Sequence, residues 1–212
     1  TYLKMDIHTK RNLELTENLR TKERTYSLLW LLDKTKTAMG SRMLKQMIEN
    51  PLIDKEEIEN RYDMVSKLLE EFLLKDELKD LLKEVYDLER LAGRVSFGNA
   101  NARDLLQLKS SLKVLPRIKE IVSILGFNLV IDDLTDLYEF LDKSIYENPP
   151  ITLKEGYLIK SGYNKELDDL KLARSGGKDF IAKLEEKEKE RTGIKNLRVG
   201  YNRVFGYYIE VS

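Results

Sequence analysis

The sequence predicts a mainly α-helical protein in which a multi-helix core is followed by one long protruding helix that ends in a small β-sheet. Three observations predict this fold class. The 212 residues include 11 Gly and 4 Pro, while Leu, Lys, Glu and Asp dominate, a composition that favours long helices. Apolar residues recur at three- and four-residue intervals over most of the chain. Near the carboxy-terminal end the spacing changes to alternation, which is typical of strands.

The first part of the chain predicts two short helices and one longer helix. The short helices cover residues 27–33 and 37–49, and Asn50-Pro51 closes the second because proline disfavours helical backbone at the preceding residue. Asp54 is a suitable N-cap for the longer helix, with Glu57 three residues on. Apolar residues then follow at helical spacing: Ile58, Tyr62, Val65, Leu68, Leu69 and Phe72.

Further helical segments complete the predicted core. They cover residues 76–85, 87–95, 101–125 and 132–144, with Leu at three- or four-residue intervals. Pro116 lies inside the third of them, where a proline kinks or divides a helix. The helical pattern then stops between Tyr146 and Gly162. There, Asn148-Pro149-Pro150 predicts a turn, and the apolar residues 156–160 are compatible with a short strand.

The long helix is predicted over residues 163–191, about 29 residues and roughly 43 Å. Its first part carries a narrow apolar seam, but beyond Leu184 the sequence is polar on every side. A helix with no apolar face has nothing to bury, so this part is expected to project through solvent and to carry something at its end. Ser175-Gly176-Gly177 is the expected weak joint, because glycines in a helix interior cost about 1 kcal/mol each.

A small sheet is predicted at the end of this helix. Thr192-Gly193 closes the helix, and residues 197–201 then alternate between apolar and other side chains. After Asn202-Arg203, residues 204–211 are again rich in β-forming side chains, which predicts a hairpin or a bulge between the two halves. A two-stranded sheet is marginal alone, so we expect a continuation of the polypeptide beyond Ser212 to supply further strands.

Composition and charge exclude several classes of function. Lys plus Arg and Asp plus Glu each number 37, so the whole-chain charge is zero and predicts no partner. The chain has no Cys and one His, which excludes disulfide frameworks, thiolate metal sites and cysteine nucleophiles. No apolar run approaches the length of a membrane helix, so we expect a soluble, intracellular protein without membrane partners. The absence of an initiating Met and of a signal peptide predicts a fragment of a longer polypeptide.

The motifs that could carry chemistry favour structural interpretations, and no catalytic, cofactor-binding or metal-binding residue is predicted. Ser175-Gly176-Gly177-Lys178 resembles a phosphate loop only superficially, because a Walker motif needs Gly at position 172 and Ser or Thr at 179, where the chain has Leu172 and Asp179. Paired carboxylates such as Glu70-Glu71 and Asp132-Asp133 are expected by chance on solvated faces. His8 lacks the partners of a catalytic triad and is expected to be a capping or surface residue.

One local cluster of charge stands apart. Residues 191–212 carry Arg191, Lys195, Arg198 and Arg203 against Glu210, a net charge of +3 in a chain that is otherwise −3. These cations lie on and beside the predicted sheet, where they could meet the phosphates of a polyanion without reading bases. Ordinary surface charge is the alternative. The aromatic residues of this segment could stack on bases, although packing in a small core is the more frequent role of such side chains.

A series of motifs runs along essentially the whole chain. They are Met5-Asp6, residues 9–15, 27–29, Leu32-Asp33, Thr35, 37–44, Pro51-Leu52, 58–61, 88–91 with Arg94, 162–164, 166–168, 190–194 and 201–211. In their order and spacing, these motifs resemble the core, lever and clamp region of the MutS family of DNA mismatch-repair proteins, bacterial type.

The resemblance implies three domains and a role in gripping DNA. Residues 1–162 would form the helical core domain, 163–193 the lever helix, and 194–212 the first strands of a truncated clamp domain. The lever would couple the state of an ATPase to a clamp that holds double-stranded DNA non-specifically. By position, the DNA-binding residues would be Lys195, Arg198, Asn202 and Arg203.

The resemblance also implies what the whole protein does. Family members act as cytoplasmic homodimers that encircle DNA, find mispaired or unpaired bases, use ATP and magnesium, and recruit downstream mismatch-repair proteins. The mismatch-reading domain and the ATPase domain have no counterpart in this sequence. The fragment is therefore expected to bind no cofactor and to catalyse no reaction. A different class stays open beside this reading, namely a helical protein-interaction scaffold with no direct DNA contact.

Overall fold

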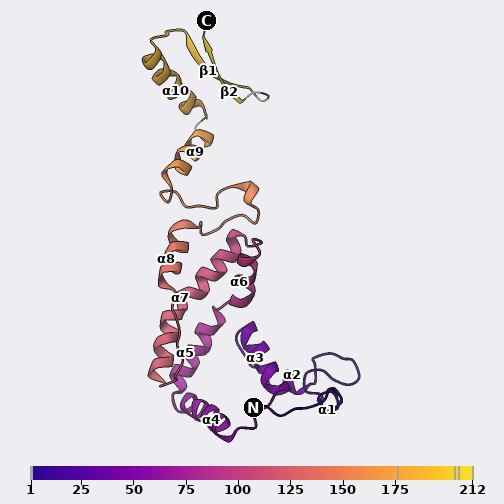
Figure 1. Cartoon of the computed structure of the whole chain (residues 1–212). Coiled ribbons are helices and arrows are strands. Elements are labelled where there is room, and N and C mark those ends of the chain that lie inside the picture. The colour runs from indigo at the N-terminus through magenta and orange to yellow at the C-terminus, as the bar shows by residue number, and fades with distance from the viewer. Residues whose placement is uncertain (1, 176, 203, 205, 212) are drawn as a thin grey trace. The chain divides into compact units, whose positions relative to one another are not determined.

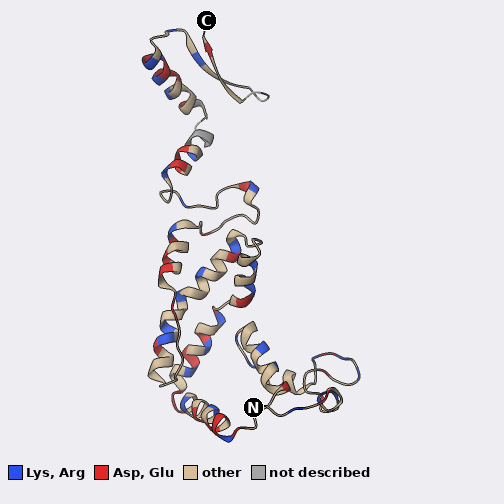
Figure 2. Cartoon of the chain, in the orientation of Figure 1, with Lys and Arg blue, Asp and Glu red and all other residues tan. Residues whose placement is uncertain are grey.

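The computed structural model of the chain describes residues 2–175, 177–202, 204 and 206–211, with the side chains at 173–175 and 178 left aside. The chain forms two compact units, Thr1–Leu158 and Ile159–Ser212 (Figure 1). The described residues are mainly helical and carry one small antiparallel sheet, so the predicted fold class is confirmed. Basic and acidic side chains are interspersed along the helices of both units (Figure 2).

The first unit opens with three capped helices, α1 (Ile7–Asn12), α2 (Leu28–Leu32) and α3 (Ala38–Glu49). In each, a side-chain oxygen of the residue before the helix accepts a hydrogen bond from a backbone N–H of the first turn, which would otherwise lack a partner. The capping residues are Asp6, Ser27 and Thr37. The two predicted helices are confirmed, whereas α1 was not predicted.

The next three helices are α4 (Lys55–Glu70), α5 (Phe72–Lys83) and α6 (Leu88–Ser96). The predicted cap is confirmed, because Asp54 Oδ1 accepts from Glu57 N at 3.0 Å. The predicted boundary between α4 and α5 is wrong by several residues. Glu71 leaves helical backbone with φ −94° and ψ 60°, so Phe72 belongs to α5 rather than to the preceding helix. No proline or glycine marks this break in the sequence.

Helix α7 (Ala102–Ile124) forms the spine of the first unit, and α8 (Thr135–Ser144) packs on it. Asn101 and Asp104 form a reciprocal capping box at the start of α7. Pro116 lies inside α7, which is not divided there. Helix α8 begins three residues later than predicted, because Leu134 adopts left-handed backbone with φ 49°.

The core of the first unit lies along α7, which contacts α5, α6 and α8. Leu112 and Ile121 are its most deeply buried apolar side chains, with 2% and 0% exposure. Ser111 is equally buried and is satisfied twice, since its hydroxyl donates to Gln107 O and accepts from Tyr86 N, each at 2.9 Å. The helical repeat therefore positions one face of α7 against three neighbours.

The link after α8 contains a short 3-10 helix, η1 (Leu153–Glu155), and no strand is found at residues 156–160. The backbone explains why this compatible segment is not one. Gly156 and Tyr157 both have positive φ, 75° and 55°, and two successive residues of this kind interrupt an extended chain. Leu158 O instead accepts a single hydrogen bond from Tyr146 N at 2.9 Å.

The second unit contains α9 (Lys165–Ser175), α10 (Gly177–Thr192), β1 (Leu197–Asn202) and β2 (Gly206–Val211). Residues on both sides of Gly176 are helical, as predicted, and helical structure begins two residues later than expected, after the cap Asn164. Gly176 itself, at the predicted joint, lies outside the described residues. At the other end, Gly193 has φ 74° and donates its N–H to Lys189 O at 2.9 Å, which confirms the predicted helix stop.

The strand β1 lies against α10, which is a departure from the solvent-surrounded helix predicted beyond Leu184. Leu197 and Val199 are buried in the described structure, at 3% and 7% exposure. Glu185 Oε2 accepts a hydrogen bond from Val199 N at 3.2 Å, and Glu185 and Lys189 are half-buried. A two-stranded sheet cannot cover its own apolar side chains, so β1 runs back along the helix that precedes it.

Candidate nucleic-acid interface

The pairing of β1 with β2 sorts the hairpin residues into two faces. One face pairs Leu197, Val199 and Tyr201 with Val211, Ile209 and Tyr207, and of these residues Leu197 and Val199 are buried. The other face pairs Arg198 with Glu210, Gly200 with Tyr208, and Asn202 with Gly206. We call this second set the polar face. Alternation along β1 therefore brings two of the predicted DNA-binding residues, Arg198 and Asn202, to the same side.

A shallow hollow of about 330 Å³ lies where α10, the following turn and β1 meet. Its lining consists of Lys189, Lys195, Asn196, Leu197, Arg198 and Glu210. Lys189 already forms an ion pair, because its Nζ lies 2.5 Å from Glu185 Oε1. Neither Lys195 nor Arg198 has an ion-pair partner among the residues that the structure describes, and both are exposed. Two cations that form no ion pair in the described structure thus share one concave surface with Glu210, which lies opposite Arg198 in the strand register.

The remaining members of the predicted basic cluster differ from these two. Arg191 is neutralised within α10, where its guanidinium lies 2.7 Å from Glu188 Oε2. The guanidinium of Arg191 lowers the pKa of the Glu188 carboxyl, as expected for an opposite charge. Arg203 lies outside the described residues. Lys195 and Arg198 therefore remain as the described cations available to an anion.

Asn202 contributes a hydrogen-bond donor at the end of β1. Its Oδ1 accepts from Val204 N at 2.8 Å, an interaction that stabilises the turn. This bond fixes the side chain and uses its acceptor. The Nδ2 group has no partner in the part of the chain that the structure describes, so it can donate outward.

Sequence reasoning missed the contribution of Glu185 to this surface. Glu185 forms an ion pair with Lys189 one turn further along α10, and the same carboxylate also accepts a hydrogen bond from the backbone of β1. The hydrogen bonds from Lys189 and then from Val199 N lower the pKa of Glu185. Glu185 thereby fastens the free edge of β1 to α10 and holds Arg198 beside the hollow.

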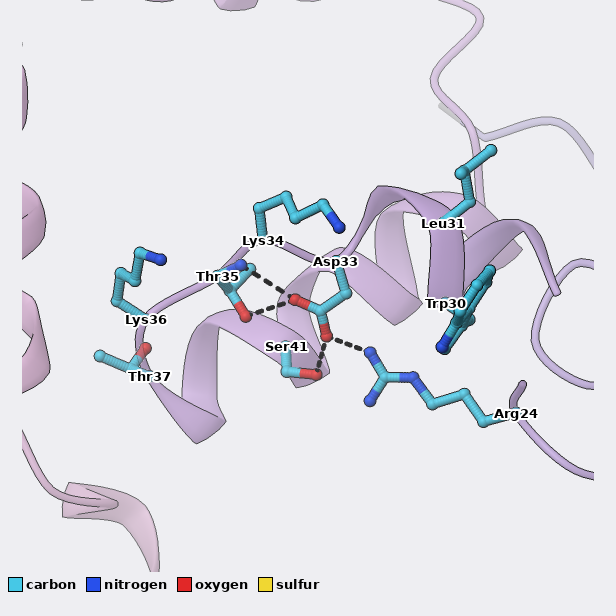
Figure 3. Close-up of a pocket in the computed structure, with 9 residues that line it drawn as sticks. All are labelled: Arg24, Trp30, Leu31, Asp33, Lys34, Thr35, Lys36, Thr37 and Ser41. Atoms are coloured by element: carbon cyan, nitrogen blue, oxygen red, sulfur yellow. Dashed lines mark hydrogen bonds and ion pairs between the residues drawn. The ribbon is translucent and has the colours of Figure 1, made fainter. Parts of the chain in front are cut away.

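A second hollow of about 550 Å³ lies between α2 and α3, and it also contains a carboxylate (Figure 3). Thr35 donates its N–H and its hydroxyl to Asp33 Oδ1 at 3.0 and 2.6 Å, while Ser41 Oγ at 2.5 Å and Arg24 bind Oδ2. These donors, led by the Ser41 hydroxyl, hold the pKa of Asp33 well below its usual range. With both oxygens occupied, Asp33 joins α2 to α3 and is not available as a general base.

The other residues considered for chemistry lie in structural surroundings. His8 is an exposed residue in the first turn of α1, and its backbone N–H donates to Oδ1 of the cap Asp6 at 2.8 Å. Within the described ranges no group of three or more metal-ligating side chains could hold a metal ion. The same ranges contain no helix that could cross a bilayer.

Fold and surface together define a mainly helical protein that carries a small β-hairpin with exposed cations and hydrogen-bond donors, groups that are suited to phosphate contacts. The sequence model of the family described as MutS domain III matches residues 8–199. The chain therefore belongs to the MutS domain III family.

Relatives with this region are named as mismatch-repair proteins. The whole chain aligns at 57% identity with proteins named DNA mismatch repair protein MutS from Bacillus cytotoxicus, Bacillus cereus and Bacillus thuringiensis. The chain spans 24% of the length of these relatives. Its fold, its family and its relatives agree with the resemblance inferred from the residue motifs.

Proposed function

We propose that this chain is the part of a DNA mismatch-repair protein that holds duplex DNA non-specifically, through phosphate contacts of its hairpin. The contact residues are Lys195, Arg198, Asn202 and Arg203. The observation that carries the proposal is that Lys195 and Arg198, which form no ion pair in the described structure, line one hollow on a hairpin whose polar face is exposed. Contacts with phosphate position a protein on DNA without reading sequence, which fits the mixture of charge and amide donors found here.

The helices of the second unit serve as the lever in this proposal. Glu185 bonds both Lys189 and the backbone of β1, so a displacement of α10 is transmitted to the hairpin that carries Arg198. In the whole protein, this lever would couple the state of an ATPase to the grip on DNA. The corresponding domains are the core at residues 1–162, the lever at 163–193 and the clamp strands at 194–212.

The activities of the whole protein enter this proposal through family membership. ATP and magnesium would bind outside the 212 residues, and the chain itself would be a non-enzymatic part of the protein. The departure of the Ser175–Lys178 segment from a Walker motif supports this placement of ATP, since helices flank the segment where the motif would follow a strand. Homodimerisation, mismatch recognition, downstream repair partners and a cytoplasmic location belong to the same proposal.

Charge neutralisation on the hairpin tests the proposed grip. The Lys195→Gln and Arg198→Gln variants of the 212-residue chain are each expected to weaken binding to a fluorescent duplex and to lower the slope of log Kd against log salt by about one. Lys183→Gln is the matched control, because Lys183 is an exposed cation of α10 without an ion pair in the described structure. Equal slopes for all three variants and the wild type would refute the assignment.

A helical interaction scaffold is the second candidate, and the exposed apolar side chains of α2 favour it. Trp30 and Leu31 are 45% and 61% exposed. Exposed apolar side chains can support protein association. Such association would be insensitive to salt, whereas a phosphate grip weakens steeply as salt rises. A titration with duplex DNA over a range of salt concentrations therefore separates the two functions.

A further inference from the structure

Tyr208 occupies an unusual place on the polar face of the hairpin. It lies opposite Gly200 in the register of the two strands, and its ring reaches across β1. A Cβ atom placed on Gly200 would lie 2.6 Å from Tyr208 Cζ and 2.7 Å from its hydroxyl oxygen. The end of the tyrosine therefore fills the space that any side chain at position 200 would need.

The hydroxyl of Tyr208 is available to a ligand. The side chain is 45% exposed, and its oxygen has no hydrogen-bond partner among the described residues. Arg198 and Asn202 lie on the same face, two residues before and after Gly200 along β1. The hydroxyl thus lies in a row of groups that can all donate hydrogen bonds.

We propose that Tyr208 is a further DNA-backbone contact of this surface, with its hydroxyl donating to a phosphate oxygen and Gly200 positioning its ring. This inference rests on the proposed grip of DNA and adds a neutral donor to it. Tyrosine hydroxyls are among the groups that bind phosphate in protein–DNA interfaces. The absence of a side chain at position 200 fixes where the hydroxyl can lie, so less conformational freedom is lost on binding.

The Tyr208→Phe variant tests the hydroxyl directly, because it keeps the ring over Gly200. The dissociation constant of the 212-residue chain for a fluorescent duplex is expected to rise about three- to tenfold, the range of a neutral hydrogen bond. The salt slope is expected to stay unchanged, since no cation is removed. Tyr207→Phe makes the same chemical change on the opposite face and is expected to bind as the wild type does.

A second variant tests the positioning by Gly200. Gly200→Ala is expected to displace the end of Tyr208 and to weaken binding by a similar factor, but to cause no further loss in the Tyr208→Phe background. Equal losses in both backgrounds would contradict the positioning. A Tyr208→Phe affinity equal to that of the wild type would overturn the hydroxyl contact. In that case, a lower slope of log Kd against log salt in Arg198→Gln would still support the proposed function. If Arg198→Gln also kept the wild-type slope, the proposed function itself would fail.

Discussion

At the scale of single residues, Asp33 illustrates how a half-buried carboxylate becomes structural. Its oxygens receive donors from Arg24, Thr35 and Ser41, and these donors lie on three different segments of the first unit (Figure 3). Removing the charge would leave several donors without an adequate acceptor. Such losses cost more than a hydrogen bond contributes when both partners are present, because the remaining groups keep their desolvation penalty.

Replacement of Asp33 by Asn is therefore expected to destabilise the chain by about 1–3 kcal/mol at neutral pH. The folded-state pKa of Asp33 lies below its ordinary value of 3.8, so its contribution is present above that value and is lost as the pH falls through the folded-state pKa. The difference in urea unfolding between wild type and variant should accordingly shrink in acid. Asp63→Asn, at an exposed position of α4, is the control and should change stability little.

Removal of the negative charge of Glu210 is expected to strengthen DNA binding, whereas removal of a hairpin cation is expected to weaken it. It lines the same hollow as Lys195 and Arg198, where its carboxylate would repel a phosphate. The Glu210→Gln variant is expected to bind duplex DNA about two- to fivefold more tightly at low salt, the range of a surface charge interaction. Binding titrations would measure this gain. Glu190→Gln changes the same charge on an exposed part of α10, and an equal gain there would assign the effect to net charge alone.

Local signals explain which residues the sequence could assign. Asp54 was predicted as a cap because the cap and the residues that mark it lie within four residues of chain. Arg198 and Asn202 were recognisable as neighbours because strand alternation is equally local. The hydrogen bond from Val199 N to Glu185 spans 14 residues and depends on how the hairpin packs on α10, so no spacing pattern in the sequence predicted it.

At the scale of secondary-structure elements, the hairpin and α10 form one working part. Strand β1 has one edge paired with β2, while the Val199 N–H on its other edge is bound by a helix side chain. An exposed strand edge is otherwise a site for unwanted pairing. The same contact that covers this edge also sets where Arg198 lies relative to Lys195.

The Glu185→Ala variant is expected to release β1 locally from α10. The Val199 amide would lose its acceptor, so its hydrogen exchange should become faster, whereas exchange in the core helix α7 should not change. Nuclear magnetic resonance or mass spectrometry can follow both regions in one sample. Glu186→Ala, one residue further along α10 at an exposed position, is the control. Unchanged exchange at Val199 in Glu185→Ala would contradict the clip between helix and strand.

Element boundaries were predicted well where they carry chemical markers and poorly where they do not. Asn101 and Gly193 mark helix ends through capping and through left-handed backbone, and the structure agrees at both. The break at Glu71 and the late start of α8 after Leu134 follow from non-helical backbone angles at these two residues. Neither Glu nor Leu is a residue type that predicts such angles. Tertiary packing decided these positions, and packing is not contained in a single stretch of sequence.

At the scale of the whole molecule, the net charge bears on how strongly DNA is attracted before any contact forms. The chain has no net charge, so its overall field cannot draw DNA toward it. In the proposed grip, binding then depends on the few contacts at the hairpin. With two or three cations meeting phosphates, a fourfold rise in salt is expected to weaken binding about 10- to 40-fold.

The same reasoning predicts indifference to mispaired bases. The proposed contact groups of the hairpin are an ammonium, a guanidinium and an amide, and the phosphates they would meet are the same at paired and mispaired positions. We therefore compare a perfectly paired duplex with a duplex that carries one mismatch. The dissociation constants of the 212-residue chain for the two are expected to differ by less than about twofold. Competition between the two duplexes, labelled in turn and measured at the same salt concentration, gives this ratio directly. A preference of about tenfold or more for the mismatch would locate base recognition inside this chain and would contradict a grip that acts on the backbone alone.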